Sequence, residues 1–110
     1  MSTYTNTNDE DVVYIPGDFK LNVNMPAIDE LHMEDVDFTC TFYTDIRKKK
    51  TLEKSDMIKY DADNYVAPLA STDLGKGTVV VEYAAEIPDE DFDGNIRKEV
   101  VVVHTKLKIK

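Results

Sequence analysis

Two valine-rich stretches decide the fold of this chain of 110 residues: residues 78–88 read TVVVEYAAEIP, and residues 96–109 read IRKEVVVVHTKLKI. Both consist largely of β-branched and aromatic side chains, which favour extended strands. The residues between them, 89–95, read DEDFDGN, a polar loop with a glycine that tolerates positive φ. The sequence therefore predicts one long β-hairpin.

The register of this hairpin follows from its pattern of apolar residues. With Pro88 opposite Ile96, one side of the pair becomes mostly apolar. The facing residues on that side are Tyr83 and Val101, Val81 and Val103, and Val79 and Thr105. On the other side Glu86 faces Lys98, a favourable cross-strand charge pair. Because a slip of one residue would mix the two faces, we expect the pairing to be well specified.

The second strand of the hairpin is expected to extend past the first. In the same register Leu107 and Ile109 lie opposite Gly77 and Gly75, beyond the start of the partner strand. An apolar strand end without a neighbour is an open edge, which proteins usually cover or pair. Either the N-terminal strand of the same chain covers these two residues, or a neighbouring subunit does. Both residues are therefore candidates for contact with a partner.

Shorter strands are predicted before this hairpin. Residues 19–25 alternate between apolar and polar, and so do residues 36–44, where Val36, Phe38, Cys40 and Phe42 share one face. Further strands are expected at 51–54, 57–60 and 64–69, with connections at 26–35 and 71–77 and an exposed basic turn at 47–50. Six to eight short strands and no long helical pattern predict an all-β, antiparallel sandwich.

Length and composition fit a single folded domain. A chain of 110 residues leaves little room for a second domain, and its 42% of hydrophobic residues supply one modest core. Residues 1–11, MSTYTNTNDED, offer almost nothing to bury, so we expect a flexible N-terminal arm. The domain itself is expected to span residues 12–110.

The charge balance bears on the class of partner. The net charge is −9, from 22 acidic and 13 basic residues. Nucleic acids and anionic membranes are bound through lysine and arginine, so neither is an expected partner. The charge serves solubility or fits a basic or mixed-charge protein partner, and the two interpretations are compatible. No signal peptide and no apolar run of the ~18 residues of a membrane span is present, so we expect synthesis in a cytoplasm.

Catalytic chemistry has little support in the sequence. Cys40 and His104 are the one pair that could resemble a thiol–imidazole dyad. Cys40 shares an apolar face and is expected to be buried and inert, whereas His104 should point away from the core. No serine lies in a nucleophile-elbow motif, and a single cysteine excludes an internal disulfide and a Cys-based zinc site. We expect no catalytic site, no metal and no cofactor.

The hairpin loop is the most distinctive polar segment. Its alternate aspartates, Asp89, Asp91 and Asp93, precede a glycine and match the opening of an EF-hand calcium loop. The match ends there, because the twelfth position is Val100 instead of glutamate and no helices flank the loop. A solvated acidic loop is therefore favoured over a calcium site. Phe92, an apolar ring among carboxylates, either tucks back or inserts into a partner.

Three segments carry a resemblance to a known group of proteins: FTCTFYTD at 38–45, DNYVAPLASTDLGKGTVVVEYAAEIPDEDF at 63–92 and GNIRKEV at 94–100. They resemble small Ig-like β-sandwich modules from virion proteins of phages that infect gut Bacteroidales, the crAss-like phages among them. Such modules resemble in turn the N-terminal domain of phage upper baseplate proteins. The resemblance spans about residues 17–105 and implies an Ig-like sandwich of about seven strands.

What the resemblance implies is a structural role in a virion. A single module without an attached fibre or receptor-binding domain implies an auxiliary (decoration) protein on the capsid surface, and a head- or tail-fibre anchoring module is the alternative. The partner would be the major capsid protein or another virion protein, with copies of the chain itself as a further contact. The candidate contact residues are Asp89, Asp91, Phe92, Asp93, Arg97, Leu107 and Ile109.

A carbohydrate or cell-surface binding domain is the second class of function. Carbohydrate sites usually present exposed aromatic rings. Tyr43, Tyr60, Tyr65 and Phe92 are available for this purpose, although the chain contains no tryptophan.

Overall fold

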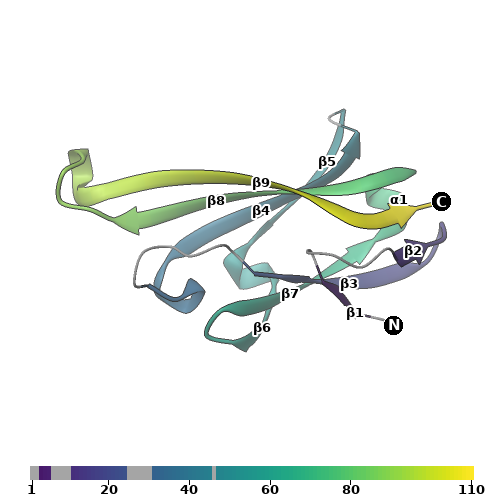
Figure 1. Ribbon diagram of the computed structural model, residues 1–110, viewed down its shortest axis with the longest axis horizontal. Helices are drawn as coiled ribbons and strands as arrows, with labels where there is room; N and C mark the ends of the chain where they lie inside the picture. Colours follow the sequence, from purple (N-terminus) through teal and green to yellow (C-terminus); the bar gives the residue numbers. More distant parts are fainter. Residues whose placement is uncertain (1–2, 6–10, 25–30, 46) are drawn as a thin grey trace.

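A computed structural model describes residues 3–5, 11–24, 31–45 and 47–110 of the chain. These residues are mostly β and form two sheets, with strand orders β1-β3-β7-β6 and β2-β9-β8-β4-β5 (Figure 1). The strands are β1 (Thr3–Thr5), β2 (Asp11–Val13), β3 (Asp18–Val23), β4 (Asp37–Asp45), β5 (Lys48–Glu53), β6 (Ile58–Asp61), β7 (Asn64–Ala70), β8 (Gly77–Pro88) and β9 (Ile96–Ile109). This agrees with the expected all-β class, with nine strands among the described residues where about seven were expected.

Short helical turns make the connections. They are η1 (Met33–Asp35), η2 (Lys54–Asp56), α1 (Ser71–Leu74) and η3 (Asp93–Asn95). Gly75 follows α1 with φ of 81°, a conformation that favours glycine, and so ends the helix. The connections expected at residues 26–35 and 71–77 therefore contain η1 and α1.

The long hairpin of β8 and β9 forms in the expected register. Pro88 lies opposite Ile96 and Glu86 opposite Lys98, and the match continues as far as Val80 opposite His104. In Figure 1 the loop end of this hairpin extends beyond the sheet of β1, β3, β7 and β6. The apolar pattern therefore predicted the pairing along most of its length.

The register shifts near the start of β8. Thr78 lies opposite Lys108, and Gly77 lies opposite Ile109 instead of Leu107. The Thr105 hydroxyl donates to the Val79 carbonyl oxygen at 2.7 Å and accepts from the Leu107 N–H at 3.2 Å, which accommodates the irregularity on β9. Because the shift is two residues, every side chain keeps its face of the sheet.

The expected open end of β9 is covered by the chain's own N-terminal region. Strand β2 pairs in parallel with β9, with Asp11 opposite Leu107 and Val13 opposite Ile109. Leu107 and Ile109 retain only 1% and 2% of their surface exposure. The assignment of these two residues as partner contacts is therefore wrong, and of the two coverings considered, the chain's own strand provides it.

The N-terminal region differs from the predicted arm. Strand β1 pairs in parallel with β3, with Thr3 opposite Lys20 and Thr5 opposite Asn22. Backbone hydrogen bonds can hold such a strand without a hydrophobic contribution, which is why its polar sequence did not predict it. The rest of the expected arm, residues 1–2 and 6–10, lies outside the described residues. With β1 and β2 both paired in parallel, the sheets are not wholly antiparallel.

One hydrophobic core draws side chains from both sheets. Phe19 and Leu21 come from β3, Cys40 and Phe42 from β4, and Tyr83 from β8, and each is at most 1% exposed. The period-two alternation of β3 and β4 delivers these residues to one side of each strand, as expected. The core fixes the two sheets and leaves the hairpin end and the opposite end of the molecule as the surfaces with distinctive side chains.

Candidate protein-docking surfaces

The hairpin loop is braced by an internal ion pair. Arg97 Nη1 lies 2.8 Å from Asp89 Oδ2, and the two side chains are 25% and 19% exposed. The Asp89 N–H donates to the Asn95 carbonyl oxygen at 2.9 Å, and the Asp91 N–H donates to Asp89 Oδ1 at 3.0 Å. Gly94, with φ of 76°, makes the sharp turn. Asp89 and Arg97 thus hold the loop in shape, a different role from the direct partner contact expected of them.

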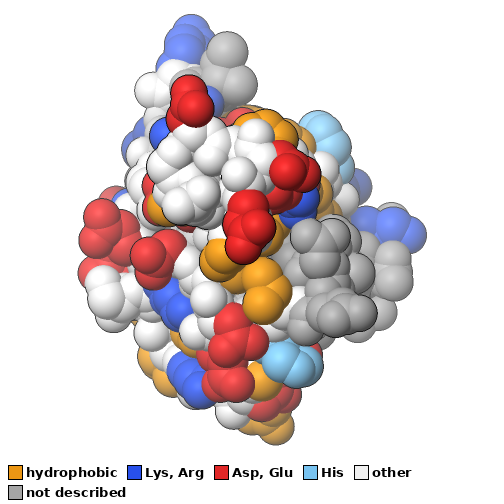
Figure 2. All heavy atoms as spheres, turned by 90° about the vertical axis from the view of Figure 1, so that its left-hand side faces the viewer, with side chains coloured by type: hydrophobic (Ala, Val, Ile, Leu, Met, Phe, Trp, Pro, Cys, Tyr) orange, Lys and Arg blue, Asp and Glu red, His pale blue; other side chains and the backbone are white. Residues whose placement is uncertain are grey.

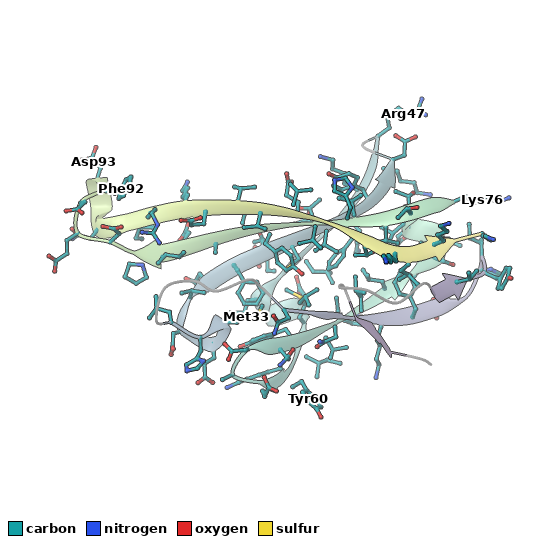
Figure 3. The ribbon with its side chains drawn as sticks, in the orientation of Figure 1. Met33, Arg47, Tyr60, Lys76, Phe92 and Asp93 are labelled. Carbon is teal, nitrogen blue, oxygen red and sulfur yellow. The ribbon has the colours of Figure 1, made fainter. Side chains whose placement is uncertain are left out.

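The outer part of this loop is exposed. Phe92 retains 50% of its surface, and Glu90, Asp91 and Asp93 surround it on the same short segment. Figure 3 shows Phe92 and Asp93 together at this tip of the molecule. An exposed ring on a braced loop loses little conformational entropy when it is bound, which suits a contact with a partner.

A small groove continues from the loop onto the adjoining strands. It measures about 270 Å³, and its apolar lining residues are Val36, Pro88 and Ile96. Its polar lining includes Asp35, Asp37 and Glu86. Figure 2, which faces this end, shows a few hydrophobic side chains surrounded by acidic ones. We call this groove and the loop tip together the acidic end; its exposed acidic residues are Glu34, Asp35, Asp37, Glu86, Glu90, Asp91 and Asp93.

Lys54 closes one side of this groove. Its Nζ donates to the carbonyl oxygens of Glu34 and Val36, each at 2.8 Å, and lies 5.7 Å from the centre of the Phe38 ring and 5.9 Å from that of Tyr65. Beyond Lys54 a larger groove of about 800 Å³ follows β4, lined in part by Met57 and Tyr65. The lysine, the first residue of η2, therefore ties η1 to the end of β5.

Replacing Lys54 by methionine is expected to lower the free energy of unfolding by about 1–2 kcal/mol, because two backbone carbonyls lose a charged donor. Urea denaturation measures the change. Lys59→Met is the matched control: Lys59 pairs with Glu34 at the surface and should cost about 0.5 kcal/mol or less. Equal losses in the two variants would contradict the special role of Lys54.

Basic residues gather at the opposite end of the molecule. The β4–β5 turn carries Arg47 and β5 begins with three lysines, 48–50, so the expected basic turn is largely a strand. Gly77 places this turn next to β8, because a Cβ on that glycine would lie 3.2 Å from the Thr44 Cβ. Figure 3 shows Lys76 at the end opposite Phe92 and Arg47 at the upper edge of the same half of the molecule.

The termini of β2, β8 and β9 meet at this basic end. The Ile15 N–H donates to the Lys110 carbonyl oxygen, and the Lys110 N–H donates to the Val13 carbonyl oxygen, both at 2.9 Å. Tyr14 and Ile15, which lie next to Lys110, are 68% and 36% exposed. We define the basic end by Lys76, Lys108 and Lys110 with the apolar pair Tyr14 and Ile15. Arg47 is ion-paired with Asp45 at 2.9 Å, and the acidic residues Asp18 and Asp73 lie on adjoining elements.

Neither the groove nor the basic end was predicted from the sequence. The lysine run was interpreted as a turn, and Tyr14 was placed within the expected domain without a role. One signal was available: acidic residues concentrate in residues 86–93, whereas residues 106–110 and 47–50 contain only basic charges. Because the two strands of a hairpin run in opposite directions, such segments separate toward opposite ends of the sheet.

Cys40 and His104 lie apart in the structure. Cys40 is fully buried in the core, and burial raises the pKa of its thiol to about 12. His104 is exposed on the outer face of β9, as expected. Within the described residues no group of three or more His, Cys, Asp or Glu side chains is placed to hold a metal ion. No helix in this part of the chain is long and apolar enough to cross a membrane.

The thiol of Cys40 is expected to be unreactive in the folded protein. Ellman's reagent at mildly alkaline pH should label it only at the rate at which the protein opens, and urea should accelerate labelling as unfolding begins. Labelling within the mixing time in the absence of urea would contradict the burial of this residue.

His32 responds to its neighbour Asp63. Its Nδ1 lies 2.9 Å from Asp63 Oδ2, and this hydrogen bond raises the pKa of His32 above 6.5. Since the folded-state pKa is raised, the stabilisation is complete below the unfolded pKa and disappears as pH rises through the folded value. An NMR titration should give a pKa above 6.5 that Asp63→Asn lowers; an unchanged pKa in the variant would refute the assignment.

The four aromatic residues considered for carbohydrate binding do not form one platform. Tyr65 is 4% exposed and packs edge-on against Phe38 at 5.2 Å between ring centres. Lys49 covers Tyr43 at 4.9 Å from its ring centre. Tyr60, 77% exposed on β6, and Phe92 at the hairpin tip belong to different sheets.

Comparisons with known proteins do not place the chain in a family. No family model, no curated protein and no solved structure matches the chain.

Proposed function

We propose that this protein is a non-enzymatic structural protein of a bacteriophage virion: an auxiliary (decoration) protein that binds the capsid surface. The resemblance of residues 38–45, 63–92 and 94–100 to Ig-like virion modules gives the setting. The observation that carries the docking role is the braced hairpin tip, on which Phe92 is 50% exposed among carboxylates. A head- or tail-fibre anchoring module remains the alternative setting for the same contact.

We also infer that the two sheets form an Ig-like sandwich. In that fold four strands in the order A-B-E-D face a sheet that contains C, F and G, with C′ added in variable-type domains. The sheet β1-β3-β7-β6 matches A-B-E-D. The strands β9-β8-β4-β5 of the other sheet match G-F-C-C′, and the letters follow the order of the strands along the chain. The shared hydrophobic core supports the face-to-face arrangement. Strand β2 is then an addition beside G, and the parallel pairings of β1 with β3 and of β2 with β9 depart from the antiparallel sheets of that fold.

The acidic end favours a basic patch on the partner. Its exposed carboxylates surround apolar residues of the groove, as at interfaces where a charged rim encloses an apolar centre. The groove is small, about 270 Å³, near the lower limit of roughly 300 Å³ for small-molecule sites, and it opens between the exposed hairpin loop and η1. A protruding side chain from a protein partner is therefore the favoured occupant.

Purified virions test the proposal. Particles banded in a density gradient and treated with an antibody against the purified chain should carry the protein on their capsids, visible by immunogold electron microscopy. Label confined to the tail would favour the fibre-anchoring alternative. Presence of the protein in the infected lysate but absence from the particles would overturn the virion assignment.

A further inference from the structure

We propose that the acidic end of one copy binds the basic end of a second copy, so that copies of this chain associate head to tail. This goes beyond docking on a capsid protein, because it assigns a second occupant to the groove in copies whose acidic end does not contact the capsid: the exposed pair Tyr14 and Ile15 of another molecule. It also assigns a function to the basic end, which the contact with the capsid leaves unused.

Each end of the molecule combines exposed apolar residues with an excess of charge of one sign, although Lys54 lines the groove at the acidic end and Asp18 and Asp73 adjoin the basic end. At the acidic end Pro88 and Ile96 line the groove, Ile96 is 43% exposed, and acidic side chains form the rim. At the basic end Tyr14 is 68% exposed beside Lys110, whose backbone is hydrogen-bonded to Val13 and Ile15. The two surfaces are complementary in charge, and the groove at one end can receive an exposed apolar side chain from the other.

The two ends are too far apart to attract each other within one molecule. The molecule is 45 Å along its longest axis, whereas charges in solution interact over about 10 Å at 0.1 M salt. Each end therefore attracts groups of opposite charge independently of the other end. The net charge of −9 opposes association at very low salt, but moderate salt screens that long-range repulsion while leaving close contacts attractive.

The contact is heterologous, because two different surfaces meet. Such contacts form rings when the rotation closes and open chains when it does not. A copy held on a capsid protein by its acidic end would present its basic end to the next copy. The proposed self-association does not depend on that setting, and it is measured on the isolated chain.

Sedimentation equilibrium of the purified protein tests the proposal. At about 0.1 M salt the average mass should rise above the monomer mass of 12.5 kDa as the concentration approaches about 1 mM. At about 1 M salt, where the screening length falls to roughly 3 Å, it should return toward the monomer. A monomer at all concentrations and both salt levels would overturn the proposal.

Charge exchange between two variants tests which surfaces meet. One variant carries Asp37→Lys, Glu90→Lys and Asp91→Lys at the acidic end, and the other carries Lys76→Glu, Lys108→Glu and Lys110→Glu at the basic end. Each variant alone should lose self-association by tenfold or more, and an equimolar mixture should regain it. Failure of the mixture to associate, with both variants folded by circular dichroism, would overturn the proposed pairing.

Two further variants separate this contact from general charge effects. Glu82→Lys reverses a charge in the middle of β8, away from both ends, and should leave association unchanged. Tyr14→Ala should weaken it by tenfold or more without altering the net charge. If Glu82→Lys weakened association as much as Tyr14→Ala does, the two ends would not be the surfaces in contact.

Discussion

Replacing Phe42 by alanine will lower the free energy of unfolding by about 3–5 kcal/mol, the usual range for removing a buried phenylalanine ring. Phe42 is fully buried, and its strand is held between β5, through Lys50, and β8, through Val81. The empty space would lie at the centre of the core shared by both sheets. Since a domain of this size has only about 5–15 kcal/mol of stability, the variant should be close to its folding limit.

Urea denaturation followed by circular dichroism measures this loss. Val102→Ala is the matched control, because Val102 is 45% exposed on the outer face of β9 and should change stability by about 0.5 kcal/mol or less. A loss below about 1 kcal/mol for Phe42→Ala would contradict the position of this ring in the core.

The double variant Phe92→Ala with Asp91→Lys should reduce binding to the virion partner on the order of 100-fold, with little change in melting temperature. The reason is that Phe92 contributes exposed apolar area and Asp91 contributes exposed charge. Neither side chain braces the loop: the Asp89–Arg97 pair does, and the Asp91 hydrogen bond to Asp89 comes from its backbone N–H.

Co-sedimentation of the variant with particles that lack the protein measures the loss of binding. Tyr60→Ala with Glu82→Lys is the matched control, because it removes one exposed ring and reverses one acidic charge away from the acidic end. Equal binding of wild type and the Phe92 variant would remove the hairpin tip from the contact. A large fall in melting temperature would instead show that the tip supports the fold.

The sequence predicted those parts of the fold that its apolar alternation specifies. The pairing of β8 with β9 from Pro88 to Val80, the buried face of β4 and the exposed position of His104 all follow from period-two patterns. Such patterns state which face a side chain takes and, through facing pairs, which register buries it.

The parts that the sequence did not predict depend on backbone hydrogen bonds or on distant partners. Strand β1 has no apolar alternation, and its pairing with β3 is a backbone contact. The irregularity at Thr105 follows from a side-chain hydroxyl that bonds the Val79 carbonyl oxygen. Asp89 and Arg97 were expected to contact a partner but instead pair with each other. The sequence did not predict this pair, because its two residues are eight positions apart across a loop.

The parallel pairing of β2 with β9 has a consequence for biosynthesis. Residues 11–13 leave the ribosome long before residues 107–109, yet each provides the neighbour of the other. Until that late contact forms, the backbone hydrogen-bonding groups of both segments are available to other chains, which is a known route to strand exchange and aggregation. Closure of this region therefore requires residues 107–109 to have been synthesised, and a chain truncated before Leu107 should be recovered mainly as insoluble material.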